Sequence, residues 1–454
     1  MSSTIAAIAT PMSAGGIGIV RISGEEAQQI ADKVFKGVKG IKLVDTQGYV
    51  AQYGKVYDGD TPIDEAIALV FKAPKSYTGE NVVELSCHGG LYVMQRVLRA
   101  VFNAGATPAQ AGEFTKRAFL NGKIDLAQAE SVMGVISAQG QQGLQASLSL
   151  REGRLSKKID EITNNLISSA AHMSAWVDYP EDDVPELDFS VLKEQFESAR
   201  ESLEQLLKTF DSTKAITQGV NTVIAGRPNV GKSTLMNLIS GTKRSIVTDI
   251  AGTTRDVVEQ TVRLGEVVMN LADTAGIRET DDPVESIGVD IAKKRIESAE
   301  FILAVFDASQ TLDKEDKDLI ELCRDRNVIA VINKTDLEKQ LDTDYIESNF
   351  KNVVYISASS GDGYEKLSDC AAKILGTDKI DTTAAVITTE RQRACCVKAV
   401  ESINEALSAM DMGLTLDAIN VCIDDAVSAL LELTGKKAGE EIVNNVFHRF
   451  CVGK

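Results

Sequence analysis

An eight-residue stretch near the middle of the chain has the spacing of a phosphate-binding loop. The residues GRPNVGKS at 226–233 follow the apolar run NTVIA and precede the helical pattern STLMNLIS. In such a loop, Gly226 and Gly231 let backbone N–H groups face phosphate oxygens at a helix N-terminus. Lys232 should reach the β- and γ-phosphates, and Ser233 should bind Mg²⁺. The loop residues predicted to contact a nucleotide are Asn229, Val230, Gly231, Lys232, Ser233 and Thr234.

Three further motifs indicate that the base is guanine. NKTD at 333–336 ends the apolar run NVIAVIN, and the Asp336 carboxylate can accept from the ring N–H and the exocyclic amine of guanine, a donor pair that adenine lacks. Asn333 and the aliphatic stem of Lys334 would support the base. SAS at 357–359 follows another strand pattern, and DTAG at 273–276 would lie beside the γ-phosphate. The contacts expected from these motifs are Asn333, Lys334, Asp336, Ser357, Ala358, Ser359, Asp273, Thr274, Ala275 and Gly276.

Hydrolysis needs a group that places the attacking water, and the residue after DTAG is Ile277, whose side chain cannot do so. Glu285 is a candidate for this role; the alternative is an exposed loop acid. Asn229 could bind a monovalent cation through its amide oxygen, and Thr254 is the expected second side-chain ligand of Mg²⁺. The loop TDIAGTTRD could fold its carbonyls over the same point, with contacts from Thr248, Asp249, Ile250, Ala251, Gly252, Thr253 and Thr254.

The composition and hydrophobic periodicity of the sequence predict a multidomain α/β protein. Residues 1–120 alternate short strand patterns with glycine and proline turns, which is typical of an α+β domain. Residues 121–215 and 381–454 show helical periodicity. Between them, residues 216–380 alternate continuous apolar strands with helices, which indicates a buried parallel sheet. We therefore expect a discontinuous all-α domain with a Ras-like P-loop G domain, built on a doubly wound sheet, inserted into it.

Composition limits the classes of function. The 454 residues carry a net charge of -18, which opposes unaided nucleic-acid binding, so an RNA partner would require a local basic patch or a second protein. No apolar run is long enough to span a membrane, and the N-terminus lacks the basic region of a signal peptide, so we expect a cytoplasmic protein. The seven cysteines form no C-x-x-C pair. The three histidines are too few and too dispersed for a zinc site, and His88, after an apolar strand, has no other histidine near it in the sequence. The acidic run DYPEDDVPELD at 178–188 is interpreted as a solvated loop.

The order of the four nucleotide motifs resembles that of the translation-factor-like GTPases, and other segments resemble one family over essentially the whole chain. These segments are GIGIVRISG, ELSCHGG, GEFTKRAFLNGKIDLAQAE, GRPNVGKS, DIAGTTRD, DTAGIRE and the terminal CVGK. They are similar to those of the tRNA-modification GTPase family MnmE, also called TrmE. One departure is Cys87, where the family often has glycine. We interpret Cys87 as a buried side chain, because adjacent strand residues point to opposite faces.

The resemblance implies a homodimer formed through the N-terminal domain, which binds 5,10-methylenetetrahydrofolate or 5-formyltetrahydrofolate as one-carbon donor. It places the folate contacts on Arg21, Glu84, Lys123 and Lys454. It places K⁺ on the Asn229 side chain and on backbone oxygens near Thr248, Ile250 and Thr253, and it gives the water-orienting role to Glu285. With the FAD-dependent partner MnmG (GidA), in a heterotetramer, the family adds an aminomethyl or carboxymethylaminomethyl group to carbon 5 of the wobble uridine of certain tRNAs.

The resemblance also implies a catalytic role for Cys451, whose thiolate could act as nucleophile or proton-transfer group in the modification. The alternative is a free thiol at a frayed end of the chain. Three alternatives for the whole protein remain: a ribosome-assembly GTPase, a folate-dependent aminomethyl transferase with a regulatory GTPase, and a structural adaptor. The first often carries an RNA-binding KH domain after the G domain, but residues after 381 are helical and acidic and contain no G-x-x-G loop.

Overall fold

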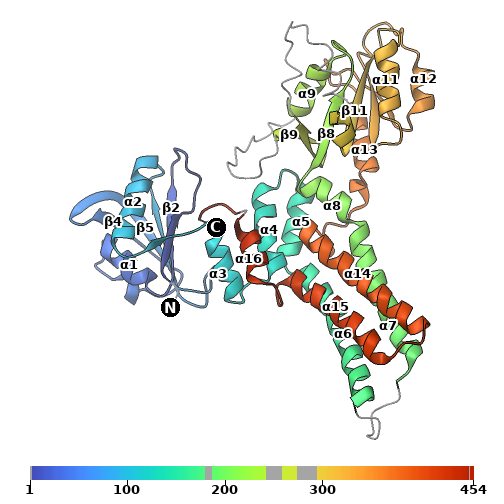
Figure 1. Cartoon of the computed structure of the whole chain (residues 1–454). Helices are drawn as coiled ribbons and strands as arrows, with labels where there is room; N and C mark the ends of the chain where they lie inside the picture. The colour runs from blue at the N-terminus through green and yellow to red at the C-terminus, as the bar shows by residue number, and fades with distance from the viewer. Residues whose placement is uncertain (1–2, 179–186, 242–257, 273–293, 449, 454) are drawn as a thin grey trace. The chain divides into compact units, whose positions relative to one another are not determined.

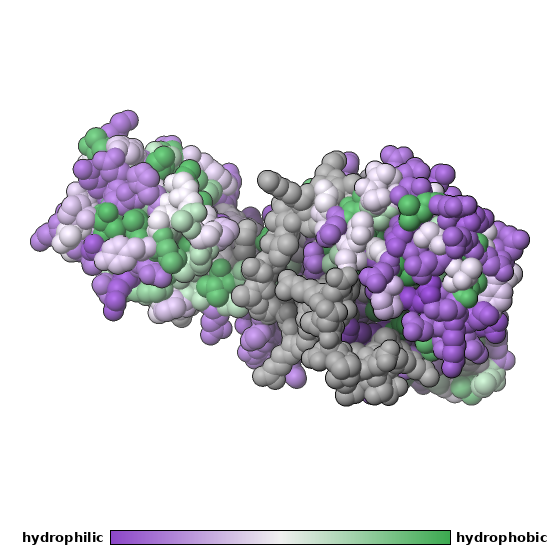
Figure 2. Space-filling model, turned by 90° about the horizontal axis from the view of Figure 1, so that it is seen from above, coloured by the Kyte–Doolittle hydropathy of each residue, from purple (hydrophilic) through white to green (hydrophobic). Residues whose placement is uncertain are grey.

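The computed structural model describes residues 3–178, 187–241, 258–272, 294–448 and 450–453 (Figure 1). Contacts within the chain group it into two compact units, Met1–Met133 with Leu431–Lys454, and Gly134–Leu430. In the described part, no helix combines the length and the apolar character that a membrane crossing requires. Figure 2 shows that apolar residues are scattered in small groups among hydrophilic ones on the face that it presents.

A seven-stranded sheet, in the order β3-β4-β5-β6-β2-β1-β7, forms the centre of the first unit. Neighbouring strands are antiparallel except for β1 and β7, which are parallel. The strands are β1 (Ile5–Ile8), β2 (Gly18–Ser23), β3 (Phe35–Gly37), β4 (Val50–Asp58), β5 (Thr61–Phe71), β6 (Val82–Cys87) and β7 (Thr107–Pro108). The helices are α1 (Ala27–Val34), α2 (Leu91–Asn103), α3 (Glu113–Leu120) and, at the C-terminal end, α16 (Glu440–His448), with a 3-10 turn at Leu43–Asp45. The predicted α+β fold is confirmed.

The two faces of this sheet differ because strand residues alternate between them. One face packs on α1 and α2, and its core includes Val20, Ile22, Val83, Leu85 and Cys87. The other face presents a row of residues paired across four strands, Tyr53, Ile67, Ser86 and Ile19. Tyr53 and Ile67 on this row are exposed. The first unit therefore has one buried sheet face, whereas the other face is exposed at Tyr53 and Ile67 and covered near β1 by the cluster of Ile5, Ala7, Ala109 and Phe114.

The C-terminal segment belongs to the first unit. Val446, Phe447 and Phe450 pack with residues of α4 (Leu126–Ser137) in an apolar cluster. Beyond the cluster, Val452 forms a β-bridge with Ala111, and the N–H of Gly112 donates to the Cys451 carbonyl at 3.3 Å. The tail is therefore held by backbone hydrogen bonds.

Helices α5 (Gln141–Arg151), α6 (Arg154–Asp178), α7 (Phe189–Lys208), α8 (Phe210–Thr217), α14 (Glu390–Asp411) and α15 (Leu416–Thr434) belong to the helical part of the second unit. α14 packs along α7, although 181 residues lie between the end of α7 at Lys208 and the start of α14 at Glu390.

The second sheet has the order β13-β12-β11-β8-β10-β9 and is parallel except for its edge strand β9. The strands are β8 (Val220–Ala225), β9 (Val258–Leu264), β10 (Val267–Ala272), β11 (Phe301–Asp307), β12 (Val328–Asn333) and β13 (Val353–Tyr355). The helices are α9 (Lys232–Gly241), α11 (Lys314–Leu322), α12 (Thr343–Asn349) and α13 (Tyr364–Ile374), followed by a 3-10 turn at Thr377–Lys379. β11 and β12 are buried at every residue, as the continuous apolar runs predict.

His88, directly after β6, is hydrogen-bonded to Asp64, a pairing that the sequence did not predict. Its Nδ1 lies 2.8 Å from Asp64 Oδ1, and its backbone N–H donates to Asp64 Oδ2, also at 2.8 Å. The hydrogen bond with Asp64 raises the pKa of the His88 imidazole above its usual value. Cys87 is buried and burial raises the pKa of its thiol to about 12, so it forms no reactive pair with His88.

We predict that Asp64→Asn returns the His88 pKa toward the ordinary imidazole value of about 6.5. Because the folded pKa is raised, the pair stabilises the fold fully below the unfolded pKa, and this contribution disappears as pH rises through the folded pKa. NMR titration of the three histidine rings, assigned with His88→Gln, measures the shift. An unchanged His88 titration in Asp64→Asn would show that Asp64 is not its cause.

Candidate functional site

The phosphate-binding motif lies between β8 and α9, as predicted. Gly226 has φ 154°, Gly231 has φ 97°, and Asn229 adopts a left-handed conformation with φ 61°. Glycine meets no steric penalty at these values, whereas asparagine is one of the few other residues that enter the left-handed region readily. The sequence therefore fits the sharp curl that turns the end of the strand into the start of the helix.

Close approach of the backbone also requires the two glycines. A Cβ on Gly226 would lie 2.5 Å from the Val305 carbonyl oxygen, and a Cβ on Gly231 would overlap the Asn333 side-chain amide. The two glycines therefore let the loop pack closely against β11 and Asn333 while its backbone curls as a phosphate-binding loop does. The residues present therefore fit a nucleotide phosphate group.

Lys232 begins α9 and folds back over the loop. Its Nζ donates to the carbonyls of Gly226 at 2.8 Å and Arg227 at 2.6 Å. Burial lowers the pKa of this ammonium below its usual value. The charge is thus held above the loop, where the phosphates of a nucleotide would lie.

The Asn333 side chain joins the phosphate loop to the base-recognition loop. Its Nδ2 donates to the Val230 carbonyl at 2.9 Å, and its Oδ1 accepts from the Ala358 N–H at 3.0 Å. Asn333 is buried at the end of β12, and β12 lies between β11 and β13 in the sheet. The carboxyl ends of parallel strands are where open α/β sheets bind ligands.

The other base-recognition residues gather at the same place. Lys334, with φ 63°, donates through Nζ to the Asn229 carbonyl at 2.7 Å and to Asp307 Oδ2 at 2.6 Å. Burial alone would raise the pKa of the Asp307 carboxyl, but hydrogen bonds from Lys334 and Ser309 outweigh it, so this pKa is lowered. Asp307 is thus an ionised partner that fixes the lysine stem.

Asp336 is also positioned before any base binds. Its Oδ1 accepts a hydrogen bond from the Ser357 hydroxyl at 2.7 Å, and that hydroxyl lies 3.0 Å from Ser359 Oγ. The sequence motifs NKTD and SAS, more than twenty residues apart, are therefore in contact. The second carboxylate oxygen and the fixed orientation suit the double hydrogen bond with guanine.

Arg227 is a residue of this site that sequence reasoning missed. Its guanidinium forms ion pairs with Asp313 and, through Nε at 3.1 Å, with Asp316, the capping-box residues of α11. Burial raises the pKa of Asp316, although Arg227 opposes the shift. The ion pairs connect the phosphate loop to α11, and no sequence motif connects Arg227 with residues 313–316.

Several predicted residues lie outside the part of the chain that the structure describes. They are Thr248, Asp249, Ile250, Ala251, Gly252, Thr253, Thr254, Asp273, Thr274, Ala275, Gly276, Glu285 and Lys454. Of the predicted Mg²⁺ and K⁺ ligands, the described ones are Ser233, in the first turn of α9, and Asn229.

A second cluster lies in the first unit around Arg21. Its Nε donates to Glu84 Oε1 at 2.8 Å, and its Nη1 donates to the Gly453 carbonyl at 3.1 Å. The guanidinium lies 5.7 Å from the centre of the Tyr77 ring and 5.6 Å from that of Phe114. The cluster therefore combines a cation, a carboxylate and two aromatic rings, which are groups that can contact an aromatic heterocycle and an anion.

The remaining predicted residues of this cluster differ in their surroundings. Lys123 donates through Nζ to the Pro74 carbonyl at 3.2 Å, on an exposed surface. Cys451 is exposed, with its neighbours Val452 and Gly453 held against Ala111 and Arg21. The backbone contacts thus bring the end of the tail to the Arg21 side chain.

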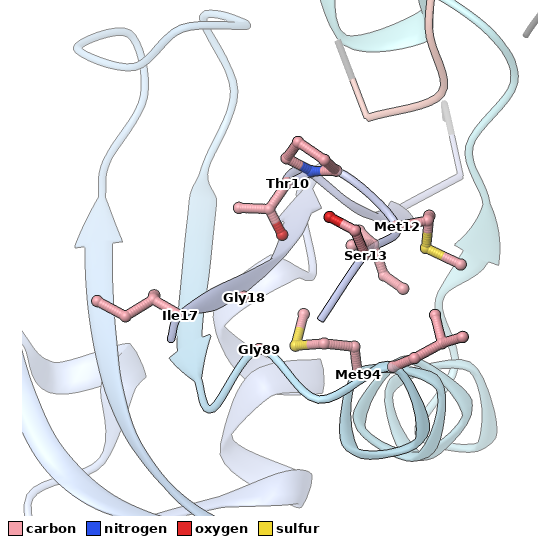
Figure 3. A pocket seen from close by; sticks show the side chains of 10 residues that line it. Thr10, Met12, Ser13, Ile17, Gly18, Gly89 and Met94 are labelled. Carbon is pink, nitrogen blue, oxygen red and sulfur yellow. The ribbon is translucent and has the colours of Figure 1, made fainter. Parts of the chain in front are cut away.

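A hollow elsewhere in this unit is too small to hold a cofactor. Figure 3 shows Met12, Ser13 and Met94 around it, together with Gly18 and Gly89. Its volume is about 10 Å³, which is about that of one water molecule by the same measure.

We predict that Gly231→Ala lowers the affinity for GTP by at least about 100-fold, because the new methyl group would overlap the Asn333 amide in a φ region unfavourable for alanine. Gly241→Ala is the matched control, since a Cβ at Gly241, at the end of α9, meets nothing within 4 Å. Titration with a fluorescent GTP analogue measures both affinities. Equal affinities would contradict the geometry assigned to the loop.

Known proteins match this chain along nearly its whole length. Residues 4–123 match the family model described as the N-terminus of the GTP-binding protein TrmE, and residues 126–451 match the MnmE helical domain. The protein named tRNA modification GTPase MnmE of Clostridioides difficile (strain 630) is 40% identical over 456 residues, which cover 99% of each chain. The protein of the same name from Bacillus subtilis (strain 168) is 39% identical over 457 residues, 99% of this chain and 100% of its own.

A crystal structure of Aquifex aeolicus Era aligns at 29% identity with 40% of this chain and 66% of its own, with a TM-score of 0.26. The family models together cover most of the sequence, and the relatives align from end to end. The chain therefore belongs to the tRNA modification GTPase MnmE family.

Proposed function

We propose that this protein is a potassium-activated GTPase that acts with the flavoprotein MnmG (GidA) on certain tRNAs. Together they add an aminomethyl or carboxymethylaminomethyl group to carbon 5 of the wobble uridine, with 5,10-methylenetetrahydrofolate or 5-formyltetrahydrofolate as one-carbon donor. One observation carries the proposal: a phosphate loop closed by Asn333 lies within a chain that aligns from end to end with proteins named tRNA modification GTPase MnmE.

In this proposal the nucleotide is GTP with Mg²⁺, held by Ser233 and Thr254. K⁺ is held by the Asn229 side chain with backbone oxygens near Thr248, Ile250 and Thr253. A cation beside the phosphates would balance charge in the transition state, which is the main requirement of phosphoryl transfer. Glu285 orients the water, since Ile277 cannot.

The proposed folate site is the cluster around Arg21. Glu84 accepts from the pterin N–H and amine groups, while Arg21, Lys123 and Lys454 offer charge to the glutamate tail. The ring contacts of Arg21 with Tyr77 and Phe114 and its hydrogen bond to Gly453 support a site at this place. The exposed Tyr53 and Ile67 side chains on this sheet offer apolar surface for a homodimer through this domain.

We assign the domains as an α+β folate-binding and dimerisation domain (1–120), a helical domain (121–215 with 381–454) and a G domain (216–380). GTP hydrolysis drives a conformational cycle and does not supply the modification chemistry, because phosphoryl transfer has no direct use in forming a carbon–carbon bond. The protein acts in the cytoplasm. Its net charge of -18 leaves the tRNA-facing positive charge to MnmG, with which it forms a heterotetramer.

Two other functions are less well supported. A ribosome-assembly switch with an RNA-binding KH domain would not place the long helices α14 and α15 after the G domain. A folate-dependent aminomethyl transferase with a regulatory GTPase would modify its substrate without the flavoprotein. The requirement for MnmG distinguishes this last function from the proposed one.

We predict that GTP hydrolysis is at least about tenfold faster in potassium than in matched sodium buffer, because a cation at the phosphates stabilises developing charge. Asn229→Ala should remove most of this stimulation while nucleotide binding persists. Steady-state rates at several protein concentrations measure both effects, and a rise per subunit with concentration would indicate pairing of G domains. Equal rates of the wild-type protein in both salts would contradict the K⁺ site and favour the ribosome switch.

We predict that Cys451→Ser abolishes wobble-uridine modification and leaves GTP hydrolysis unchanged, because the tail is held at Arg21 in the proposed folate cluster, whereas the GTP motifs belong to the other unit. Modification is measured by nucleoside analysis of tRNA in a reconstituted reaction with the flavoprotein. Loss of both activities, or of neither, would contradict the role given to the thiol.

A further inference from the structure

One surface of the helical part of the second unit has an unusual combination of charge and apolar exposure. It is the hairpin of α14 and α15, joined by residues 412–415 (Figure 1). Between Lys398 and Lys436 the sequence contains seven carboxylates and no lysine, arginine or histidine. The carboxylates are Glu401, Glu405, Asp411, Asp417, Asp424, Asp425 and Glu432.

These charges are largely uncompensated in the folded chain. From Glu401 to Asp425, and within the part that the structure describes, Asp411 alone has a lysine or arginine at ion-pair distance, Lys193 of α7 at 2.6 Å. Glu405, Asp417 and Asp425 are exposed. The hairpin therefore presents a strongly negative surface.

An apolar groove of about 390 Å³ lies between the two helices of this hairpin. Ala409 of α14, Met412 and Leu414 of the connection, and Ala418 and Cys422 of α15 line it. Met412 is 75% exposed and Leu414 is 51% exposed, so two large apolar side chains of the groove lining are accessible to solvent.

The acidic and apolar residues are arranged along the groove. Glu405 and Ser408 follow helical spacing on one face of α14, which ends directly before Met412, and Ala418, Cys422 and Asp425 do so on α15. Burial raises the pKa of the Cys422 thiol, and the nearby charges of Glu405 and Asp425 add to the shift, which places both carboxylates beside it. The groove is thus apolar toward the connection and acidic toward its other end.

The charge restricts what can cover the groove. RNA and anionic membrane surfaces carry the same sign of charge and would be repelled. A second copy of the same hairpin would bring carboxylates against carboxylates. A small-molecule site would need several converging polar groups, whereas the groove is open and mainly apolar. A positively charged amphipathic helix fits, because it can place apolar side chains near Met412 and lysine or arginine near Glu405 and Asp425.

We propose that the α14–α15 groove is the docking site for a basic amphipathic helix of the FAD-dependent partner. This inference rests on the proposed function, which requires a partner that supplies the positive charge for tRNA. The apolar contacts provide affinity, and the carboxylates accelerate association and exclude acidic proteins.

The test is the dissociation constant between the full-length chain and the purified flavoprotein, measured by isothermal titration calorimetry at low and high salt. Met412→Ser/Leu414→Ser should weaken binding at least about tenfold, because these side chains would be central apolar contacts. Glu405→Lys/Asp425→Lys should weaken binding and reduce its dependence on salt. Basal GTP hydrolysis should stay within about twofold for all variants, since none of these residues belongs to the nucleotide site.

Two controls match these variants. Ile41→Ser changes a side chain as exposed as Leu414, at 51%, in the first unit. Asp318→Lys reverses an exposed charge on α11. Both should bind the flavoprotein like the wild type, and thermal melting shows that every variant is folded.

Two results would overturn the inference, and they have different meanings. If the wild-type chain binds and Met412→Ser/Leu414→Ser binds equally well, the groove is not the docking site, while the proposed function stands. If the wild-type chain does not bind the flavoprotein although its GTPase responds to potassium, both the docking site and the partner in the proposed function are wrong.

Discussion

The hydrogen bonds of one buried side chain, Asn333, connect the two loops on which nucleotide binding depends. Its amide holds the Val230 carbonyl on one side and the Ala358 N–H on the other. An unsatisfied buried polar group costs about 1–3 kcal/mol, so loss of this amide would leave two such groups at the end of the sheet. Lys334, fixed by Asp307, adds a second connection to the phosphate loop at the Asn229 carbonyl. The phosphate and base subsites are therefore built as one unit.

The first unit depends on a different constraint. Its C-terminal segment packs back against the domain that contains the N-terminal sheet. The apolar contacts of Phe447 and Phe450 bring the tail back, and the Ala111–Val452 bridge fixes its direction. Arg21 then donates hydrogen bonds to Glu84 on the neighbouring strand and to the Gly453 carbonyl of the tail. A site assembled from residues more than 400 positions apart needs this packing, which explains why a terminal segment is ordered here.

Local patterns predicted the parts of the protein that depend on local chemistry. The P-loop glycines, the NKTD and SAS motifs and the buried strands lie where their spacing indicated. The pairings that the sequence could not predict depend on strand register and helix packing. Examples are His88 with Asp64, 24 residues away, and Arg227 with Asp313, 86 residues away. Arg21 and Glu84 were both identified from the family resemblance, but their ion pair follows from the β2–β6 register.

The coupling of tRNA modification to the guanine-nucleotide site is tested most directly by measuring modification by Asp336→Asn with GTP and with xanthosine triphosphate. An asparagine amide can donate to the extra carbonyl of xanthine, whereas it cannot accept both guanine donors as the carboxylate does. The variant should lose GTP-supported wobble-uridine modification and regain it with xanthosine triphosphate, because the modification is coupled to this nucleotide site. Modification by the variant that continues unchanged with GTP would contradict both the base assignment and the coupling.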